Sequence, residues 1–183
     1  MITDLASFKN DWYQPGNKWK ILLWYFVNAF ILQNKYNPSS ALKVFVLKLF
    51  GAKIGHGVVI KQMVSVKYPW KLKVGNYSWI GEKVWIDNLA EVSIGNNVCI
   101  SQGAMLLCGN HDYKKPTFDL MVKPIILEDG VWIGAQSTVC PGVTCKSHAV
   151  LSVQSVAINE LNAYMIYQGN PAKIVRERKI NEA

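Results

Sequence analysis

The side chain best suited to chemistry is His111, which lies in the sequence Gly-Asn-His-Asp at positions 109–112. Imidazole accepts a proton near neutral pH, so a histidine can act as a general base toward a hydroxyl group. A neighbouring carboxylate can fix the tautomer of such a ring, and Asp112 is adjacent in the sequence. We therefore interpret His111 as a candidate catalytic base and Asp112 as its candidate partner. A loop histidine that is merely solvated is the alternative.

The histidines and cysteines together do not form a metal-binding pattern. The histidines stand at positions 56, 111 and 148, and the cysteines at 99, 108, 140 and 145 include no Cys-x-x-Cys pair. Metal sites usually contain at least one closely spaced pair of ligands. We therefore predict no metal, and we interpret the cysteines as small buried side chains in a reducing compartment.

Two further strings could bind an extended ligand. The first, at 132–135, reads Trp-Ile-Gly-Ala and carries a large aromatic ring at an outward position. The second lies near the C-terminus, where Lys173, Arg176 and Arg178 stand at helical spacing. Such cations could meet a polyphosphate, or they could simply be solvated.

A repeat of six residues must position these groups. A helix needs apolar residues every three or four positions and a single strand alternates, so a period of six fits neither. It predicts short strands stacked into a regular coil, with each anchor pointing inward and a tight turn at each corner. Glycine often follows an anchor, where we expect it to supply positive φ angles. The anchors are Ile54, Ile60, Val66, Val74, Ile80, Ile86, Ile94, Ile100, Leu106, Leu127, Ile133, Val139, Cys145 and Leu151.

The coil is expected to cover residues 51–158. Its first two turns are 20 residues long instead of 18, so we expect two-residue bulges near 68–70 and 88–90. The register breaks once, and the inserted segment is polar and marked by proline and glycine. We therefore predict that a loop leaves the coil at 107–126 and carries His111.

The two ends of the chain lie outside the repeat. Residues 1–50 are expected to form a helical arm, with helices near 18–33 and 38–50. Residues 159–183 are expected to contain a strand and then a short helix that begins at Pro171. The predicted fold is thus mainly β, a coil with an N-terminal helical arm and a short C-terminal helix.

Composition limits the classes of partner. The net charge is +8 and the pI is about 9.3, but no cluster of Lys and Arg is interleaved with stacking aromatic residues, so we predict no nucleic acid. The chain opens without the pattern of a secretory signal peptide. Residues 19–32 are strongly apolar but shorter than the ~20 residues needed to span a bilayer. They could pack on the coil or lie in a membrane interface.

Beyond these residue-level arguments, the chain resembles the hexapeptide-repeat acyltransferases. The likeness rests on the Ile-Gly-x-x-Val repeat, the looped histidine and the string Gly-Asn-Pro-Ala-Lys-x-Val-x-Arg at 169–178. It implies a left-handed parallel β-helix. A narrower resemblance is to the colanic acid biosynthesis acetyltransferases, which are related to the maltose, galactoside and nodulation O-acetyltransferases. It is carried by Asp4-Leu5, by 50–55 (Phe-Gly-Ala-Lys-Ile-Gly), by 68–72 (Tyr-Pro-Trp-Lys-Leu), by Ile100-Ser101-Gln102 and by Asn110-His111-Asp112.

The resemblance implies a cytoplasmic homotrimer that transfers an acetyl group from acetyl-CoA to a sugar or lipid-linked sugar hydroxyl in exopolysaccharide or capsule biosynthesis. Contact with the inner face of the membrane stays open. His111 matches the family's general base, while Asp87 or Asn88 could contact the acceptor. In place of the family's Thr-Lys this chain has Ile158-Asn159, and Lys146 could substitute for one phosphate contact. The positions that match the coenzyme site are Trp132, Gly134, Ala135, Val153, Lys173 and Arg176.

Two other functions can be built on the same coil. A γ-type carbonic anhydrase needs three zinc histidines, two of them close together in the loop, and this chain lacks the second loop histidine. A non-enzymatic scaffold or binding module would tolerate loss of His111. Fold alone does not separate these functions from acetyl transfer.

Overall fold

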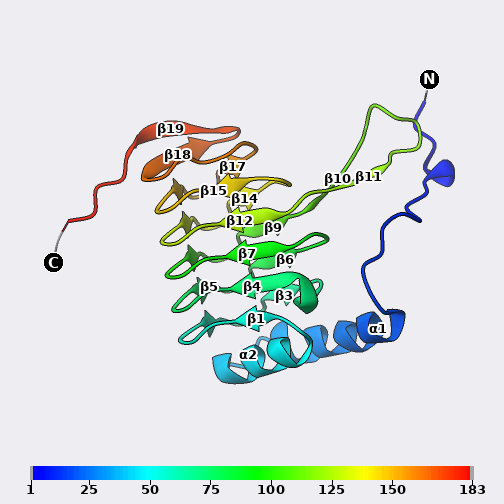
Figure 1. Ribbon diagram of the computed structural model, residues 1–183, viewed down its shortest axis with the longest axis horizontal. Helices are drawn as coiled ribbons and strands as arrows, with labels where there is room; N and C mark the ends of the chain where they lie inside the picture. The colour runs from blue at the N-terminus through cyan, green and yellow to red at the C-terminus, as the bar shows by residue number, and fades with distance from the viewer. Residues whose placement is uncertain (1, 182–183) are drawn as a thin grey trace.

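Three sheets, built almost entirely from parallel strand pairs, form the sides of the predicted coil. The structure is a computed structural model that describes residues 2–181, and its short strands stack into a parallel β-helix of about six turns with helices at one end (Figure 1). The first sheet contains β1 (Lys53–Ile54), β4 (Leu72–Val74), β7 (Val92–Ile94), β12 (Ile125–Leu127) and β15 (Thr144–Cys145). The second contains β2 (Val59–Ile60), β5 (Trp79–Ile80), β8 (Cys99–Ile100), β13 (Trp132–Ile133), β16 (Val150–Leu151), β18 (Met165–Gly169) and β19 (Ala172–Glu177). The third contains β3 (Ser65–Val66), β6 (Trp85–Asp87), β9 (Met105–Leu107), β14 (Thr138–Val139) and β17 (Val156–Ala157).

The aliphatic anchors stack in vertical rows inside this coil. In the second sheet Ile60 pairs with Ile80, and Ile80 in turn pairs with Ile100. These side chains are almost fully buried, as are the equivalent anchors of the other two sheets. Because each anchor covers the one beneath it, the six-residue period builds one continuous apolar core. The predicted register is confirmed.

The glycines that follow the anchors have a different role from the one expected. Gly55, Gly75, Gly81, Gly95 and Gly134 do not have positive φ. The positive-φ position comes three residues after an anchor, where non-glycine residues such as Tyr77 and Lys83 occupy it in several turns. At Gly75 the constraint is space, since a Cβ there would come within 2.5–2.7 Å of backbone atoms of Gly95 and Asn96. Glycine lets successive turns approach closely.

Replacing Gly75 by alanine should therefore destabilise the coil. The neighbouring atoms belong to backbone and cannot rotate away, so we expect a loss of about 1–3 kcal/mol in the free energy of unfolding. Chemical denaturation followed by circular dichroism measures this change. Lys61→Ala is the matched control, because this exposed residue follows the anchor Ile60 and already has a Cβ. Equal stability of the two variants would contradict the packing argument.

Two helices cover the N-terminal end of the coil, as predicted. Helix α1 (Lys18–Val27) continues through the π-helical turn η2 (Asn28–Leu32), and α2 (Ser40–Leu49) follows. The Asn17 side chain caps α1 by accepting hydrogen bonds from the first turn, and Ser39 caps α2. The indole N–H of Trp24 donates to the Val66 carbonyl at 2.8 Å, which fixes α1 to the third sheet.

All three departures from the regular period lie at the corner between the third and first sheets. In the first turn this corner holds the short helix η3 (Pro69–Lys71), and in the second it holds the bend at 88–90. In the third turn the predicted loop leaves the coil as a hairpin, in which β10 (Gly109–His111) pairs antiparallel with β11 (Leu120–Val122). The hairpin therefore stands above two enlarged corners (Figure 1).

The C-terminal helix predicted from Pro171 is wrong. Residues 170–171 form a turn between β18 and β19, which pair antiparallel. An Asn-Pro dipeptide suits a turn as well as a helix start, and the β-branched pair Ile174-Val175 favours a strand. Arg178 also departs from the expected helical face, because its guanidinium donates to the Gly130 carbonyl at 2.8 Å.

Candidate active site

A cavity of about 580 Å³ opens between the hairpin, the enlarged corners and the N-terminal segment 2–15, here called the strap. The strap includes the short helix η1 (Leu5–Ser7) and crosses the hairpin, where the Asp4 amide donates to the Pro116 carbonyl at 2.9 Å. Further along, the Trp70 indole donates to the Pro15 carbonyl at 2.8 Å. The lining residues are Phe8, Asn10, Tyr13, Pro15, Lys67, Tyr68, Asp87, Leu89, Gly109, His111 and Leu120.

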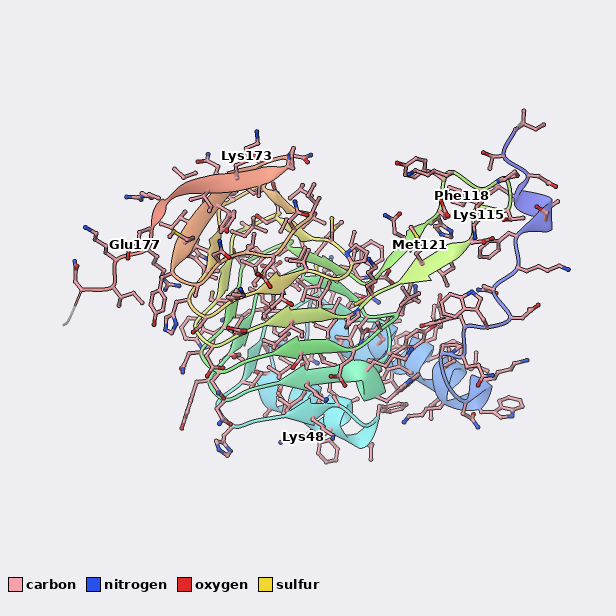
Figure 2. The ribbon with its side chains drawn as sticks, turned by 45° about the horizontal axis from the view of Figure 1, so that its top comes forward. Lys48, Lys115, Phe118, Met121, Lys173 and Glu177 are labelled. Atoms are coloured by element: carbon pink, nitrogen blue, oxygen red, sulfur yellow. The ribbon has the colours of Figure 1, made fainter. Side chains whose placement is uncertain are left out.

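His111 reaches this cavity with its ring held in place. Its Nδ1 lies 2.8 Å from the Phe118 carbonyl oxygen across the hairpin. A carbonyl can only accept, so Nδ1 carries the proton and Nε2 keeps a free lone pair. The ring stacks on Phe118 with centroids 4.4 Å apart, and Phe8 of the strap lies at 5.7 Å. Figure 2 shows Phe118 on the hairpin near the strap. This arrangement suits a general base.

Asp112 does not hold the imidazole, contrary to prediction. Its carboxylate accepts from the Lys114 amide at 3.1 Å and so closes the turn at the hairpin tip. A second carboxylate, Asp119, pairs with Lys115 at 2.8 Å on the same tip. The tautomer of His111 is set instead by the Phe118 backbone, which no side-chain motif could reveal.

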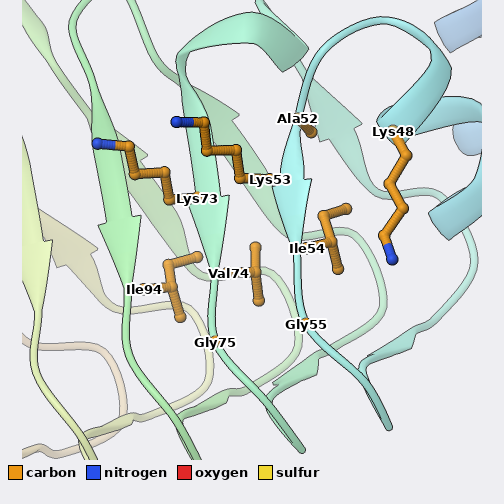
Figure 3. Close-up of a pocket in the computed structure, with 9 residues that line it drawn as sticks. All are labelled: Lys48, Ala52, Lys53, Ile54, Gly55, Lys73, Val74, Gly75 and Ile94. Carbon is orange, nitrogen blue, oxygen red and sulfur yellow. The ribbon is translucent and has the colours of Figure 1, made fainter.

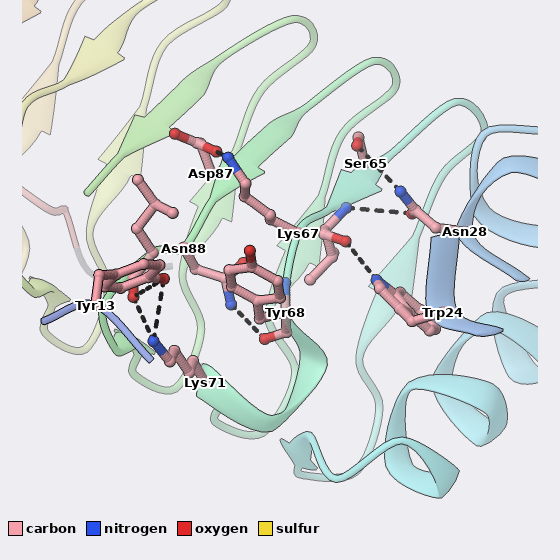
Figure 4. A network of polar contacts seen from close by, with 11 residues as sticks. Tyr13, Trp24, Asn28, Ser65, Lys67, Tyr68, Lys71, Asp87 and Asn88 are labelled. Atoms are coloured by element: carbon pink, nitrogen blue, oxygen red, sulfur yellow. Dashed lines mark hydrogen bonds and ion pairs between the residues drawn. The ribbon is translucent and has the colours of Figure 1, made fainter. Parts of the chain in front are cut away.

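The structure separates the two candidate acceptor residues. Asp87 lines the cavity, and one of its oxygens lies 2.8 Å from the Lys67 ammonium group (Figure 4). Asn88 is fully buried and uses its amide for structure, since it accepts from the Tyr68 amide at 2.9 Å and donates to the Tyr68 carbonyl at 2.6 Å. Of the two residues, Asp87 is thus the one available to a ligand.

A rigid polar cluster forms the wall beneath Asp87. The Tyr13 hydroxyl donates to the Leu89 carbonyl at 2.7 Å, and the Lys71 ammonium group donates to the same carbonyl (Figure 4). Burial raises the pKa of Tyr13 and lowers that of Lys71. Burial also raises the pKa of the neighbouring Cys108 thiol to about 11, so this cysteine is a poor nucleophile at neutral pH.

The residues predicted to hold a coenzyme lie elsewhere on the coil. Trp132 points outward from the second sheet, and its indole N–H donates to Ser101 at 2.9 Å. Gly134 and Ala135 follow it at the corner, and Val153 is exposed one turn above. None of them lines the His111 cavity.

The two predicted phosphate-binding cations, Lys173 and Arg176, are exposed on β19. Lys173 lies over the C-terminal end of the coil, away from the hairpin (Figure 2). The proposed substitute Lys146 is paired with Glu160 at 2.7 Å. Among residues 2–181 no group of three or more His, Cys, Asp or Glu side chains is close enough to hold a metal ion.

Comparison with known proteins decides the family. No family model matches the chain. It is 37% identical over 178 residues to the Escherichia coli protein named "Putative colanic acid biosynthesis acetyltransferase WcaF", and the match covers 97% of this chain and 98% of that one. The chain belongs to the hexapeptide-repeat acetyltransferases. It is therefore an enzyme that transfers acetyl groups.

Solved structures of other hexapeptide-repeat acetyltransferases share the fold. One from Vibrio cholerae superposes with a TM-score of 0.80 at 22% identity, covering 89% of this chain and 93% of that one, and it has also been solved with acetyl-CoA. A galactoside acetyltransferase in complex with coenzyme A gives a TM-score of 0.75 at 18% identity, covering 87% of this chain and 81% of that one.

Several cavity residues of this hexapeptide-repeat acetyltransferase escaped the sequence analysis. Phe8 and Tyr13 belong to the strap, which lies outside the six-residue repeat. Its sequence therefore does not indicate which part of the coil it contacts. Lys67 could have been found, because it stands 20 residues before Asp87. That interval is the length of the second turn, so the coil stacks the two opposite charges.

Proposed function

We propose that the protein transfers an acetyl group from acetyl-CoA directly to a sugar hydroxyl, with His111 as the general base. The observation that carries this proposal is the 2.8 Å contact between Nδ1 and the Phe118 carbonyl, which leaves Nε2 as the proton acceptor of a ring that lines a substrate-sized cavity. The acetyl-CoA complex of the Vibrio cholerae relative supports the choice of donor.

In this mechanism the acceptor oxygen attacks the thioester carbonyl while its proton moves to Nε2. The resulting imidazolium is stabilised by the Phe118 carbonyl, to which Nδ1–H already donates. Collapse of the tetrahedral intermediate breaks the C–S bond, and the CoA sulfur leaves and takes up the proton. No covalent enzyme intermediate is needed, which agrees with the raised pKa of Cys108.

The proposed acceptor is a sugar unit, free or lipid-linked, of an exopolysaccharide or capsule. The name of the Escherichia coli relative supports this class. The cavity suits it, since Asp87 can accept a hydrogen bond from a second hydroxyl, and Tyr68 and Tyr13 add aromatic side chains to the lining.

The complete site is proposed to form between copies of the chain in a homotrimer. His111 and Asp87 share one cavity, whereas Trp132, Val153 and Lys173 lie on other parts of the coil. A neighbouring copy could bring its coenzyme-binding wall to this chain's hairpin. A closed cyclic assembly repeats such a contact at every boundary.

Complementation between two inactive variants tests both the reaction and the shared site. His111→Ala removes the base, and Val153→Trp fills the proposed path of the pantetheine arm at an exposed position. Each homogeneous variant should release little thiol from acetyl-CoA with a soluble sugar acceptor. Co-expression of the two should restore about a quarter of wild-type activity, because random mixing gives that fraction of intact boundaries.

Two results would contradict the proposal. If mixed trimers stay as inactive as each variant alone, the base and the coenzyme wall belong to one chain. If wild-type protein releases no thiol with any sugar or lipid-linked sugar acceptor, sugar acetylation itself is wrong. Val153→Ala, which leaves the path open, is the matched control and should remain active.

A further inference from the structure

The helical end of the molecule presents an apolar face that the coil does not cover. On α1 and η2 the side chains of Trp19, Leu23, Phe26 and Phe30 are exposed, Trp19 by 79% and Phe30 by 71%. Residues 24, 28 and 32 of the same segment are buried against the coil. The exposed side chains recur every three or four positions, so they form one continuous stripe opposite the packed side.

Helix α2 adds a second stripe of the same kind. Leu42, Phe45 and Leu49 recur at the same spacing, and Phe45 and Leu49 are 64% and 70% exposed. Lys43 and Leu47 on the other side of α2 are fully buried. Both helices lie at the same end of the coil (Figure 1), and we call their two exposed stripes the apolar base.

The exposed charged side chains on and beside the two helices are lysines. Between Trp12 and Gly81 the sequence contains ten lysines and no Asp or Glu. Lys18, Lys35 and Lys48 are exposed on or beside the helices. Lys48 also lines a cavity of about 630 Å³ beside α2, together with Lys53 and the apolar side chain of Ile54 (Figure 3). Apolar and aromatic side chains with lysines and no acidic residues complement an anionic lipid surface.

The His111 cavity borders on this end of the molecule. A second cavity, of about 320 Å³, is lined by Ile21, Trp24 and Tyr25 of α1 and also by Lys67, Tyr68 and Asp87. The last three residues line the His111 cavity as well. The two cavities therefore share a wall made of Lys67, Tyr68 and Asp87.

We propose that the apolar base docks on an anionic bilayer, with α1, η2 and α2 lying in the headgroup region. Among residues 2–181 no helix is long and apolar enough to cross a membrane, so the helices would rest on the surface. The large aromatic side chains would enter the interface and the lysines would pair with lipid phosphates. This inference goes beyond the proposed acetylation and does not depend on it.

Flotation with vesicles tests the proposal on the full chain. Vesicles of phosphatidylcholine mixed equally with phosphatidylglycerol should carry the protein upward in a density gradient, and pure phosphatidylcholine should carry about tenfold less. The triple variant Trp19→Gln, Phe30→Gln, Phe45→Gln should lose about tenfold or more of the binding. The matched control, Tyr113→Gln, Ile126→Gln, Ile180→Gln, changes three exposed side chains away from the helices and should float like wild type.

Other outcomes would overturn the inference. No flotation, or equal flotation of the two triple variants, would exclude the base as a lipid-binding surface. A change in assembly state of the base variant in sedimentation without vesicles would mean that a second copy covers it. Circular dichroism verifies that each variant is folded. The residues changed in the base variant lie outside the proposed active site, so its thiol release with a soluble acceptor should equal that of wild type. This readout separates the test of lipid binding from the test of acetylation.

Discussion

The His111→Ala variant should fold like wild type and lose about 10²–10⁴-fold in turnover, the range that a positioned general base usually contributes. The side chain stands on a hairpin outside the coil, so its removal leaves the stacked anchors untouched. Thiol release from acetyl-CoA, measured with saturating sugar acceptor, gives the rate, and thermal unfolding gives the stability.

His56→Ala is the matched control for this variant. His56 is exposed at a corner of the first turn and does not line the His111 cavity. Its removal should change turnover by less than about twofold, in line with the small effects of surface substitutions. Equal rates for wild type and His111→Ala would reject the imidazole as the base.

The second large effect is expected at Asp87. Its side chain is only 14% exposed and lines the cavity that we propose for the acceptor. Asp87→Ala should lower kcat/KM for the acceptor by about 10–10²-fold, because a hydrogen bond to a charged group contributes about 1.5–3 kcal/mol. The KM for acetyl-CoA should change little. Steady-state kinetics with each substrate varied in turn separates the two effects.

The Lys67→Met variant tests whether Asp87 contacts the acceptor itself or acts only as part of its ion pair with Lys67. Lys67 is 41% exposed, so its ion pair with Asp87 is partly screened by water and contributes little to stability. The variant should keep most of its acceptor affinity if Asp87 contacts the substrate itself. A loss as large as that of Asp87→Ala would mean that the ion pair, and not the carboxylate alone, builds the site.

The coil could be predicted because its rule is local. One row of stacked anchors, such as Ile60 beneath Ile80, repeats the same contact in every turn, so the period alone defines the core. The 20-residue length of two turns likewise predicted bulges. The break in the six-residue register predicted that the chain leaves the coil between residues 107 and 126. The role of the glycines that follow the anchors was predicted wrongly. They allow the backbones of successive turns to approach closely, and the six-residue period does not reveal such a contact.

The site was predicted only in part because its walls come from distant segments. His111 and, with Asn88 as an alternative, Asp87 were named as candidates, but the strap that completes the cavity they share folds back over more than 70 residues of sequence, as the bond from Tyr13 to Leu89 shows. The partner of His111 is a backbone carbonyl, which is invisible in the residue pattern. At the C-terminus a turn and a helix start share the same Asn-Pro signal, and β pairing with β18 determined the outcome.

The position of the hairpin has a consequence for how such an enzyme can change its substrate. The chain leaves the coil after Cys108 and returns before Ile125, and the anchors on either side, Leu106 and Leu127, stay in register with their neighbours. A hairpin of different length or shape at this position would change the shape of the proposed acceptor cavity without disturbing the stacked strands. The acceptor specificity could thus change through this one corner while the rest of the β-helix stays the same.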